Sequence, residues 1–369
     1  MNLQLIITSC VVLAIFGELH AETKEQPVGF MLRATPEMRV VPLRGKRSAY
    51  VPPVKGVDAT LVFAEWADLQ PEKFGSIQDE NVVDRALIAI REWNRKNPTD
   101  TVRLRLRMFS GIYAPDWVMK HAGSVMVDYR KKQSARAVVR ATPQFWTSAY
   151  QEAWSDFQKK MAARYDAEPL ICDVSISGSM TLHTEVMWRQ PGFPWVLPAL
   201  MKAGLTRDND LACLKADITR FMEIWKKTSV EMTFNSRRNY VLVNGSLKAK
   251  KADLKFTEVL LNHIATEGKR LQKSYMIGNH SLSEYSAITH HKHEDKSHVF
   301  YALKQDHDVR NTRIYFQTEV HSANIAEELI CEGLKMGASL IELPNDITPE
   351  QISSPRMQSL RANLKSNHQ

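Results

Sequence analysis

Cysteine is scarce in this sequence, with four residues among 369. Cys10 lies in the N-terminal apolar stretch, while Cys172, Cys213 and Cys331 are far apart and surrounded by apolar residues. So few and so widely spaced cysteines argue against a disulfide framework, and no two have the spacing of metal ligands. We therefore expect buried, reduced thiols.

Long apolar runs are also missing beyond the N-terminus. Residues 3–16 are mostly apolar, residues 17–20 are more polar, and Ala21 suits the position before a cleavage site. This stretch is too short for a spanning helix and is typical of a secretory signal. We expect a signal peptide over residues 1–21, a secreted or periplasmic protein, and no membrane partner.

Glycine contributes only 15 residues, and no glycine-rich phosphate fingerprint follows any strand-like segment. This absence argues against a dinucleotide-binding sheet. The histidine tract 290–295 is typical of a flexible loop, because adjacent histidines followed by acidic residues rarely form a metal site. We therefore expect no metal and no cofactor.

Motifs for nucleic-acid binding are absent although the formal net charge is +8. Basic residues cluster at 130–132, 237–238 and 248–251. Such clusters attract anionic polymers through a long-range field. We interpret them as a solvated basic surface, compatible with an anionic carbohydrate, and we expect no nucleic-acid partner.

What the sequence does contain is a regular alternation of strand-like and helix-like segments. Segment 58–66 is strand-like and precedes an amphipathic helical pattern at 79–96. The other strand-like segments are 102–109, 171–177, 229–234, 274–278, 313–319 and 339–343, with a weaker one near 28–33. This alternation predicts an α/β fold with a parallel sheet, and the strand count favours a (β/α)8 TIM barrel.

The domain organisation follows from these elements. We expect a signal peptide at 1–21, an N-terminal segment at 22–56, the barrel at 57–346 and a C-terminal helix or tail at 347–369. Segments 111–118 and 128–144 look like insertions in the loops of the barrel.

Polar and aromatic residues gather where the strands end. In a barrel, these carboxyl ends form the active face. The candidate substrate-binding residues at or beyond them are Glu65, Trp66, Arg107, Trp117, His183, Trp188, Asn235, Asn279 and His280. Aromatic faces stack on sugars, while amides and carboxylates bind hydroxyls, so this mixture predicts a carbohydrate site.

Several short motifs resemble those of a known group. FAEWADLQPE and RLRLRMFSGIYAPDWV resemble the second and third strands of clan A glycoside hydrolases, with family-42 β-galactosidases the most similar. YDAEPLICDVSISGSMTLHTE resembles the fourth-strand region, and YFQTE resembles the seventh strand. The resemblance spans residues 58–346 and implies a barrel that cleaves O-glycosidic bonds.

This resemblance implies roles for two carboxylates. Glu319 would be the nucleophile at the end of the seventh strand, and Glu185 would be the acid/base of a retaining mechanism. Such a mechanism needs carboxyl groups about 5–5.5 Å apart. We expect partial burial and the neighbouring carboxylate to raise the pKa of Glu185.

One departure from the clan A pattern leaves alternatives open. These enzymes usually carry Asn-Glu at the end of the fourth strand, whereas this sequence has Ser177-Gly178-Ser179 there. A barrel that binds carbohydrate without catalysis is therefore an alternative. Another is a different barrel enzyme, of lyase or deacetylase type, that uses His183 or His280.

Overall fold

A computed structural model describes residues 24–33, 48–130, 135–185, 195–235, 238–243 and 246–367. Eight parallel strands form a closed barrel, which confirms the predicted (β/α)8 fold. In order around the barrel, they are β1 (Gly29–Leu32), β3 (Ala59–Glu65), β4 (Arg103–Phe109), β7 (Ile171–Ser175), β8 (Ser229–Thr233), β11 (Tyr275–Leu282), β12 (Arg313–Thr318) and β13 (Ala338–Glu342).

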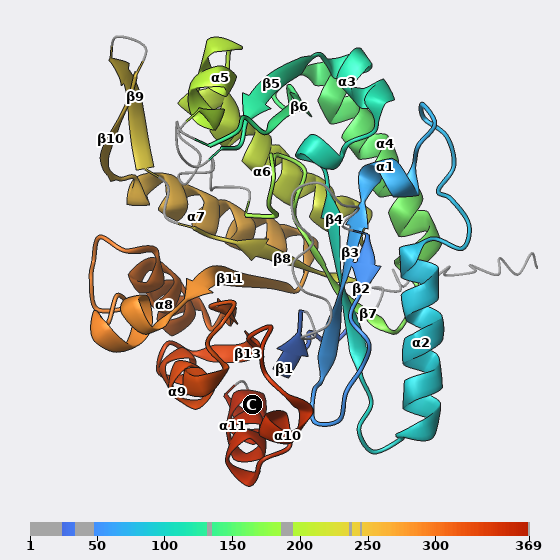
Figure 1. Cartoon of the computed structure of the whole chain (residues 1–369), viewed down its shortest axis with the longest axis vertical. Coiled ribbons are helices and arrows are strands. Elements are labelled where there is room, and N and C mark those ends of the chain that lie inside the picture. The colour runs from blue at the N-terminus through green and yellow to red at the C-terminus, as the bar shows by residue number, and fades with distance from the viewer. Residues whose placement is uncertain are drawn as a thin grey trace, which may run out of the picture.

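Helices cover the outside of these strands (Figure 1). The larger ones are α2 (Val82–Lys96), α4 (Ser148–Tyr165), α6 (Arg207–Ile224), α7 (Leu254–Leu271), α8 (Val299–Arg310), α9 (Ala326–Lys335) and α11 (Pro355–Ser366). The short ones are α1 (Trp66–Leu69), α3 (Asp116–Ala122), α5 (Val196–Lys202) and α10 (Pro349–Ile352). None of the helices in the described ranges has the length and apolar character needed to cross a membrane.

Helix α2 shows how the sequence sets these elements. Asn81 caps its first turn by accepting from the backbone N–H of Val83, and the Asp84 side chain accepts from the Asn81 N–H in return. Such a cap contributes about 1 kcal/mol. Leu87 and Ile90 are buried on the side of the helix that faces the strands.

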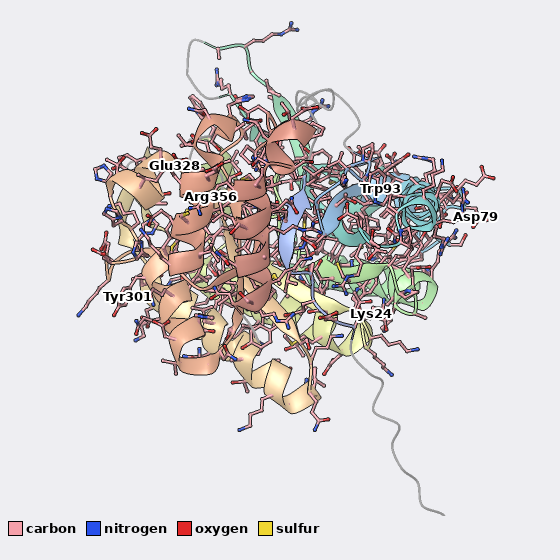
Figure 2. The ribbon with its side chains drawn as sticks, turned by 90° about the horizontal axis from the view of Figure 1, so that it is seen from below. Lys24, Asp79, Trp93, Tyr301, Glu328 and Arg356 are labelled. Atoms are coloured by element: carbon pink, nitrogen blue, oxygen red, sulfur yellow. The ribbon has the colours of Figure 1, made fainter. Side chains whose placement is uncertain are left out.

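The barrel closes through its first and last strands. Strand β1 pairs with β13 and with the beginning of β3, while the short strand β2 (Ala49–Tyr50) runs antiparallel along the later part of β3. Helix α11 packs on β1 and β13 and lies beside α9, where Arg356 and Glu328 mark the two helices (Figure 2). The predicted boundary at residue 57 is therefore one strand too late, and residues 347–369 supply the helix that completes the barrel.

Two insertions extend the loops beyond the strands. The 3-10 turn Gly111–Tyr113, α3 and the hairpin β5 (Ser124–Asp128)–β6 (Val139–Pro143) follow the third barrel strand, in agreement with the predicted insertions. A second hairpin, β9 (Arg238–Val243)–β10 (Ser246–Ala252), follows the fifth strand and projects from the body of the molecule (Figure 1). Two shorter turns follow the sixth and seventh strands, a π turn at Glu284–Thr289 and a 3-10 turn at Ala323–Ile325.

The cysteines agree with the expectation from sequence. Cys172 and Cys213 are buried, Cys331 is half-buried, and all three are free thiols. Cys10 and the whole predicted signal peptide lie outside the described residues.

Candidate active site

The barrel interior is charged where an apolar filling is usual. Arg105 of β4 is fully buried and donates to both carboxylate oxygens of Asp173, at 2.9 and 2.6 Å. It also donates to Glu342 of β13 at 3.2 Å, and its guanidinium lies 4.4 Å from the centre of the Tyr315 ring. A buried cation persists only when it is paired and hydrogen-bonded. Arg105 therefore joins three strands through the middle of the barrel.

Arg107 forms the next layer toward the mouth of the barrel. It donates to Glu342 Oε2 at 3.1 Å and approaches His280 Nε2 at 3.0 Å. Burial opposes the ionised form of Glu342, but Arg107, His280 and Arg105 together lower its pKa. The alternation of arginine in β4 thus places both buried guanidinium groups inside, as the sequence predicts for Arg107.

His280 connects this layer to Glu185. Its Nε2 lies 3.0 Å from an Arg107 nitrogen, 3.1 Å from Thr233 Oγ1 and 3.0 Å from the Tyr315 hydroxyl. Because a guanidinium only donates, Nε2 accepts and the ring proton is assigned to Nδ1. Nδ1 then donates to Glu185 Oε1 at 2.9 Å. Both ring nitrogens are engaged, which disfavours His280 as a free general base.

Glu185 is held as an anion. Burial alone would raise its pKa, but His280 and His183 lower it well below the usual range. The expected rise in the pKa of Glu185 is therefore wrong, because its immediate neighbour is an imidazole and not a second carboxylate. Its Oε2 is buried and has no hydrogen-bond partner among the described residues.

Arg33, directly after β1, places a cation near the same region. Its Nε donates to Asn345 Oδ1 at 2.6 Å, and burial lowers its pKa to about 10. With its amide oriented to satisfy both neighbours, Gln317 accepts from Arg33 Nη1 at 2.5 Å and donates to Glu342 Oε2 at 3.0 Å. Arg33 Nη2 is buried without a partner in the described part of the chain. Arg33 Nη2 and Glu185 Oε2 are thus a donor and an acceptor that no described residue satisfies.

Glu319 lies in a different environment from Glu185. It follows β12 directly, as predicted, and its backbone N–H donates to Leu282 O at 2.8 Å. Its side chain is exposed. The structure therefore distinguishes the two predicted carboxylates: Glu185 has a side chain only 13% exposed and is paired with His280, whereas Glu319 faces solvent.

The structure excludes one of the predicted sugar-stacking residues, Trp66. Trp66 is fully buried, donates to Gln70 Oε1 at 2.9 Å and packs against Trp154 and Phe157 at centroid distances of 5.0 and 5.1 Å. Trp117 contacts the edge of Trp66 and is only half-buried. Trp66 sits at the start of α1, where it packs under α4, so it cannot stack on a sugar.

The remaining candidates are arranged around the strand ends. Asn279 is fully buried and donates to Phe234 O and Asn235 Oδ1, at 2.7 and 2.8 Å, so it fastens the ends of two strands. Asn235 and His183 are half-buried, and Glu65 is buried at the end of β3. Trp188 lies outside the described residues.

Sequence reasoning missed several members of this network. Arg33, Glu231, Tyr315, Gln317 and Glu342 all contribute to it. Glu231 accepts from Thr233 at 3.0 Å and from the Tyr315 hydroxyl. The sequence feature that could have identified them is a glutamate in each of the strand-like segments SVEMT and ASLIE, which are buried throughout. A buried strand carries an acid only when a buried cation is near.

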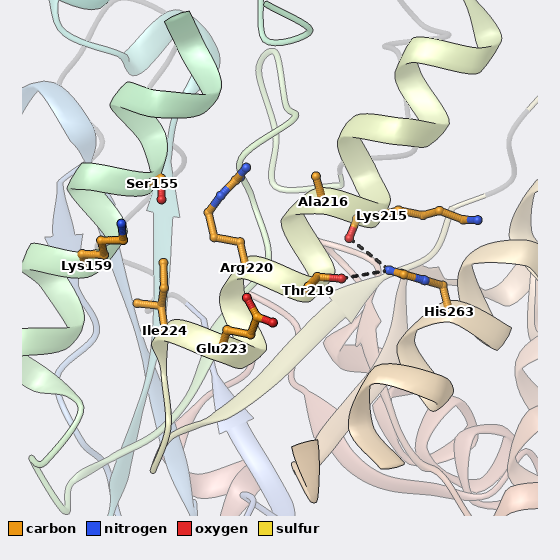
Figure 3. Close-up of a pocket in the computed structure, with 9 residues that line it drawn as sticks. All are labelled: Ser155, Lys159, Lys215, Ala216, Thr219, Arg220, Glu223, Ile224 and His263. Atoms are coloured by element: carbon orange, nitrogen blue, oxygen red, sulfur yellow. Dashed lines mark hydrogen bonds between the residues drawn. The ribbon is translucent and has the colours of Figure 1, made fainter. Parts of the chain in front are cut away.

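A hollow lies between helices of the outer layer and not at the strand ends. Its volume is about 480 Å³, and its lining includes Lys159, Lys215, Arg220 and His263 from α4, α6 and α7 (Figure 3). His263 Nε2 lies 3.1 Å from both Thr219 Oγ1 and Lys215 O. None of the predicted site residues lines this hollow.

Comparisons with known proteins bear on the fold alone. No protein-family model matches the chain, and no curated protein does. The catalytic domain of a β-amylase from Paenibacillus polymyxa is similar in structure, with a TM-score of 0.53 and 8% identity over 95% of this chain and 100% of that one. A β-galactosidase from the psychrophilic Marinomonas ef1 has a TM-score of 0.48 and 11% identity, over 91% of this chain and 59% of that one. The chain thus shares the (β/α)8 barrel fold with this β-amylase catalytic domain, and the predicted likeness to family 42 in particular stays a prediction.

Proposed function

We propose that this protein is a glycoside hydrolase that binds an oligosaccharide or polysaccharide at the mouth of its barrel. The observation that carries the proposal is Glu185, a carboxylate only 13% exposed, which His280 orients and keeps ionised at the carboxyl end of the barrel. The barrel fold, shared with a β-amylase catalytic domain, supports the same class of reaction.

The charge state of Glu185 favours an exchange of the roles that the resemblance implies. A proton donor must carry its proton at the working pH, whereas a nucleophile or base must be ionised. Glu185 meets the second requirement. We therefore assign attack, on the anomeric carbon or through water, to Glu185, and proton donation to Glu319. Arg33 Nη2 and Asn235 would bind hydroxyl groups of the sugar.

An aryl glycoside series tests this assignment. We expect turnover by the wild type, and at least 100-fold losses for Glu185→Gln and for Glu319→Gln. Glu328→Gln, on the exposed face of α9, serves as a matched control and should keep wild-type activity. Activated leaving groups need little protonation, so they should reduce the loss for Glu319→Gln and not for Glu185→Gln. If activated leaving groups instead reduced the loss for Glu185→Gln and not for Glu319→Gln, Glu319 would be the nucleophile.

Azide and product configuration separate the remaining possibilities. If Glu185 is the nucleophile, azide should restore turnover to Glu185→Ala and give a product of inverted configuration. If Glu185 acts as a base on water, the wild type itself should invert. The proposal fails if both variants are folded and neither changes the rate on a confirmed substrate.

The exposure of Glu319 favours one alternative, a carbohydrate-binding barrel without catalysis. In that case, labelled oligosaccharides should bind with an affinity that Glu185→Gln reduces, and no product should form.

The predicted secretion is a separate proposal. It is tested by N-terminal sequencing of protein expressed with residues 1–21, which should begin at Glu22.

A further inference from the structure

Two histidines of the loop that follows the sixth barrel strand lie close to a glutamate of helix α9. One ligand atom of each of His291, His293 and Glu332 lies within 4.8 Å of those of the other two. The histidines belong to the segment between the π turn Glu284–Thr289 and α8, and Glu332 is on α9, which packs against that turn. This cluster is distinct from the Glu185–His280 pair.

Two of these side chains carry buried polar atoms without partners. Glu332 is only 7% exposed, and Lys335 occupies its Oε1 at 2.6 Å, but its Oε2 has no hydrogen-bond partner in the described part of the chain. His293 Nδ1 is likewise buried and unpartnered among the described residues. A buried carboxylate oxygen and a buried imidazole nitrogen without partners are costly, and a shared ligand would satisfy both.

The backbone at His291 is strained in the same place. Its φ is +39°, in the left-handed region that side chains other than glycine rarely adopt. The neighbouring backbone holds this conformation, because the Glu294 N–H donates to His291 O at 2.8 Å and the Lys292 N–H donates to Ser286 O at 2.9 Å. Strain of this kind concentrates at functional sites. The two imidazole rings lie edge to face in the same segment, with centroids 5.9 Å apart.

The sequence alone predicts no metal at the tract 290–295, but from this geometry we propose that His291, His293 and Glu332 bind a Zn²⁺ ion. Two imidazole nitrogens and one carboxylate oxygen are a ligand set that suits Zn²⁺ and leaves a fourth position for water. Lys335 fixes the carboxylate through its other oxygen, as an outer group does in many metal sites. Hard cations such as Ca²⁺ and Mg²⁺ prefer oxygen ligands and are not expected to compete.

The site needs only a small closure to hold the ion. A tetrahedral Zn²⁺ with bonds of about 2.1 Å places its ligand atoms about 3.4 Å apart. His291 is exposed, so its side chain is free of the core and can turn toward the ion. The ion would tie the loop after the sixth strand to the helix after the seventh, and so fix two neighbouring loops of the barrel.

Titration calorimetry of the full chain with zinc chloride tests the proposal. We expect one saturable site in the wild type, and affinities lower by on the order of tenfold or more in His291→Ala, His293→Ala and Glu332→Gln. Co²⁺ should occupy the same site and show the visible absorption of a four- or five-coordinate ion. Zn²⁺ should also raise the Tm of the wild type more than that of Glu332→Gln.

Two neighbouring variants serve as matched controls. His290→Ala removes a histidine of the same tract that instead packs on Tyr285, with centroids 4.1 Å apart. Glu328→Gln removes an exposed carboxylate one turn earlier on α9. Both should bind Zn²⁺ as the wild type does. The proposal is overturned if the wild type shows no saturable binding, or if His290→Ala weakens binding as much as His293→Ala. His291→Ala keeps the test valid if Glu332→Gln fails to fold, because His291 is exposed.

Discussion

At the scale of single residues, the buried arginines determine what the barrel interior can do. Arg105 has no contact with solvent and holds Asp173 and Glu342 as its counterions. Such a network contributes little net stability compared with an apolar core, but breaking it is costly because charges remain buried without a partner. These carboxylates therefore serve to hold Arg105, and Arg107 beyond it, in place beneath Glu185 and His280.

Replacing Arg105 should expose this dependence. We expect Arg105→Gln to lower the free energy of unfolding by about 3–5 kcal/mol, because Asp173 and Glu342 lose their shared partner. Arg103→Gln, on the same strand but partly exposed beside Glu25, should cost less than about 1 kcal/mol. Urea unfolding of the three proteins measures the difference. Equal losses of unfolding free energy in the two variants would show that the buried ion pairs of Arg105 contribute no more than the exposed pair of Arg103.

The pKa of Glu185 predicts how its contribution depends on pH. The pKa in the folded protein lies below the unfolded value, which is about 4.3 for a glutamate. Its stabilising contribution is therefore complete above that pH, and is lost as the pH falls toward the folded pKa. We expect the stability difference between the wild type and Glu185→Gln to be largest near pH 7 and to narrow below about pH 4.3. Urea unfolding across this pH range measures the difference, and Glu328→Gln shows the effect of removing an exposed carboxylate. A stability difference between the wild type and Glu185→Gln that widened in acid would contradict the lowered pKa of Glu185.

At the scale of elements, glycine makes the insertion after the third strand possible. Gly111 has a φ of +58°, and a Cβ atom there would lie 2.1 Å from the carbonyl oxygen of Thr181. The Ile112 N–H donates to the same oxygen at 2.9 Å. The insertion thus packs directly on the loop that carries Glu185.

Substitutions at Gly111 and Gly204 distinguish the effect of backbone strain from the effect of the close contact with Thr181. We expect Gly111→Ala to lower the free energy of unfolding by about 2–3 kcal/mol and to reduce activity, because the loop carrying Glu185 must shift. Gly204 also has a positive φ, of +105°, but a Cβ atom there would meet only Trp146 Nε1, at an ordinary contact distance of 3.8 Å. Gly204→Ala should cost about 1 kcal/mol and leave activity unchanged. Similar losses for both variants would mean that strain alone matters.

The elements were predictable from sequence wherever their signal was local. Alternating residues predicted β4 and the inward position of Arg107, and helical spacing predicted α2 and α4. The role of Trp66 was not predictable, because an aromatic residue after a strand looks the same in a cleft as under a helix. The low pKa of Glu185 depends on His280, 95 residues later, and that contact exists only once the barrel closes.

At the scale of the whole molecule, the C-terminal helix completes the fold. Arg361 of α11 donates to both carboxylate oxygens of Asp58, each at 2.8 Å, and Asp58 in turn accepts from the Phe30 N–H of β1 at 2.9 Å. Met357, Leu360 and Leu364 are buried beneath the helix. The last helix therefore fastens the first strand.

Removal of this helix should prevent barrel closure. We expect a chain ending at residue 353 to lose cooperative unfolding, because β1 and β13 would expose their apolar outer faces. A chain lacking only residues 368–369 should unfold as the full-length protein does. Calorimetry of both truncations provides the measurement. A cooperative transition in the shorter chain would show that the barrel closes without α11.

The guanidinium of Arg105 also has a kinetic consequence for the molecule. Because it links β4, β7 and β13 through the centre of the barrel, these three strands can separate only in one event. Their amide hydrogens should therefore exchange with deuterium at a common slow rate, close to that of global opening. Strand β2, held to β3 by two paired positions at the rim, should exchange independently and much faster.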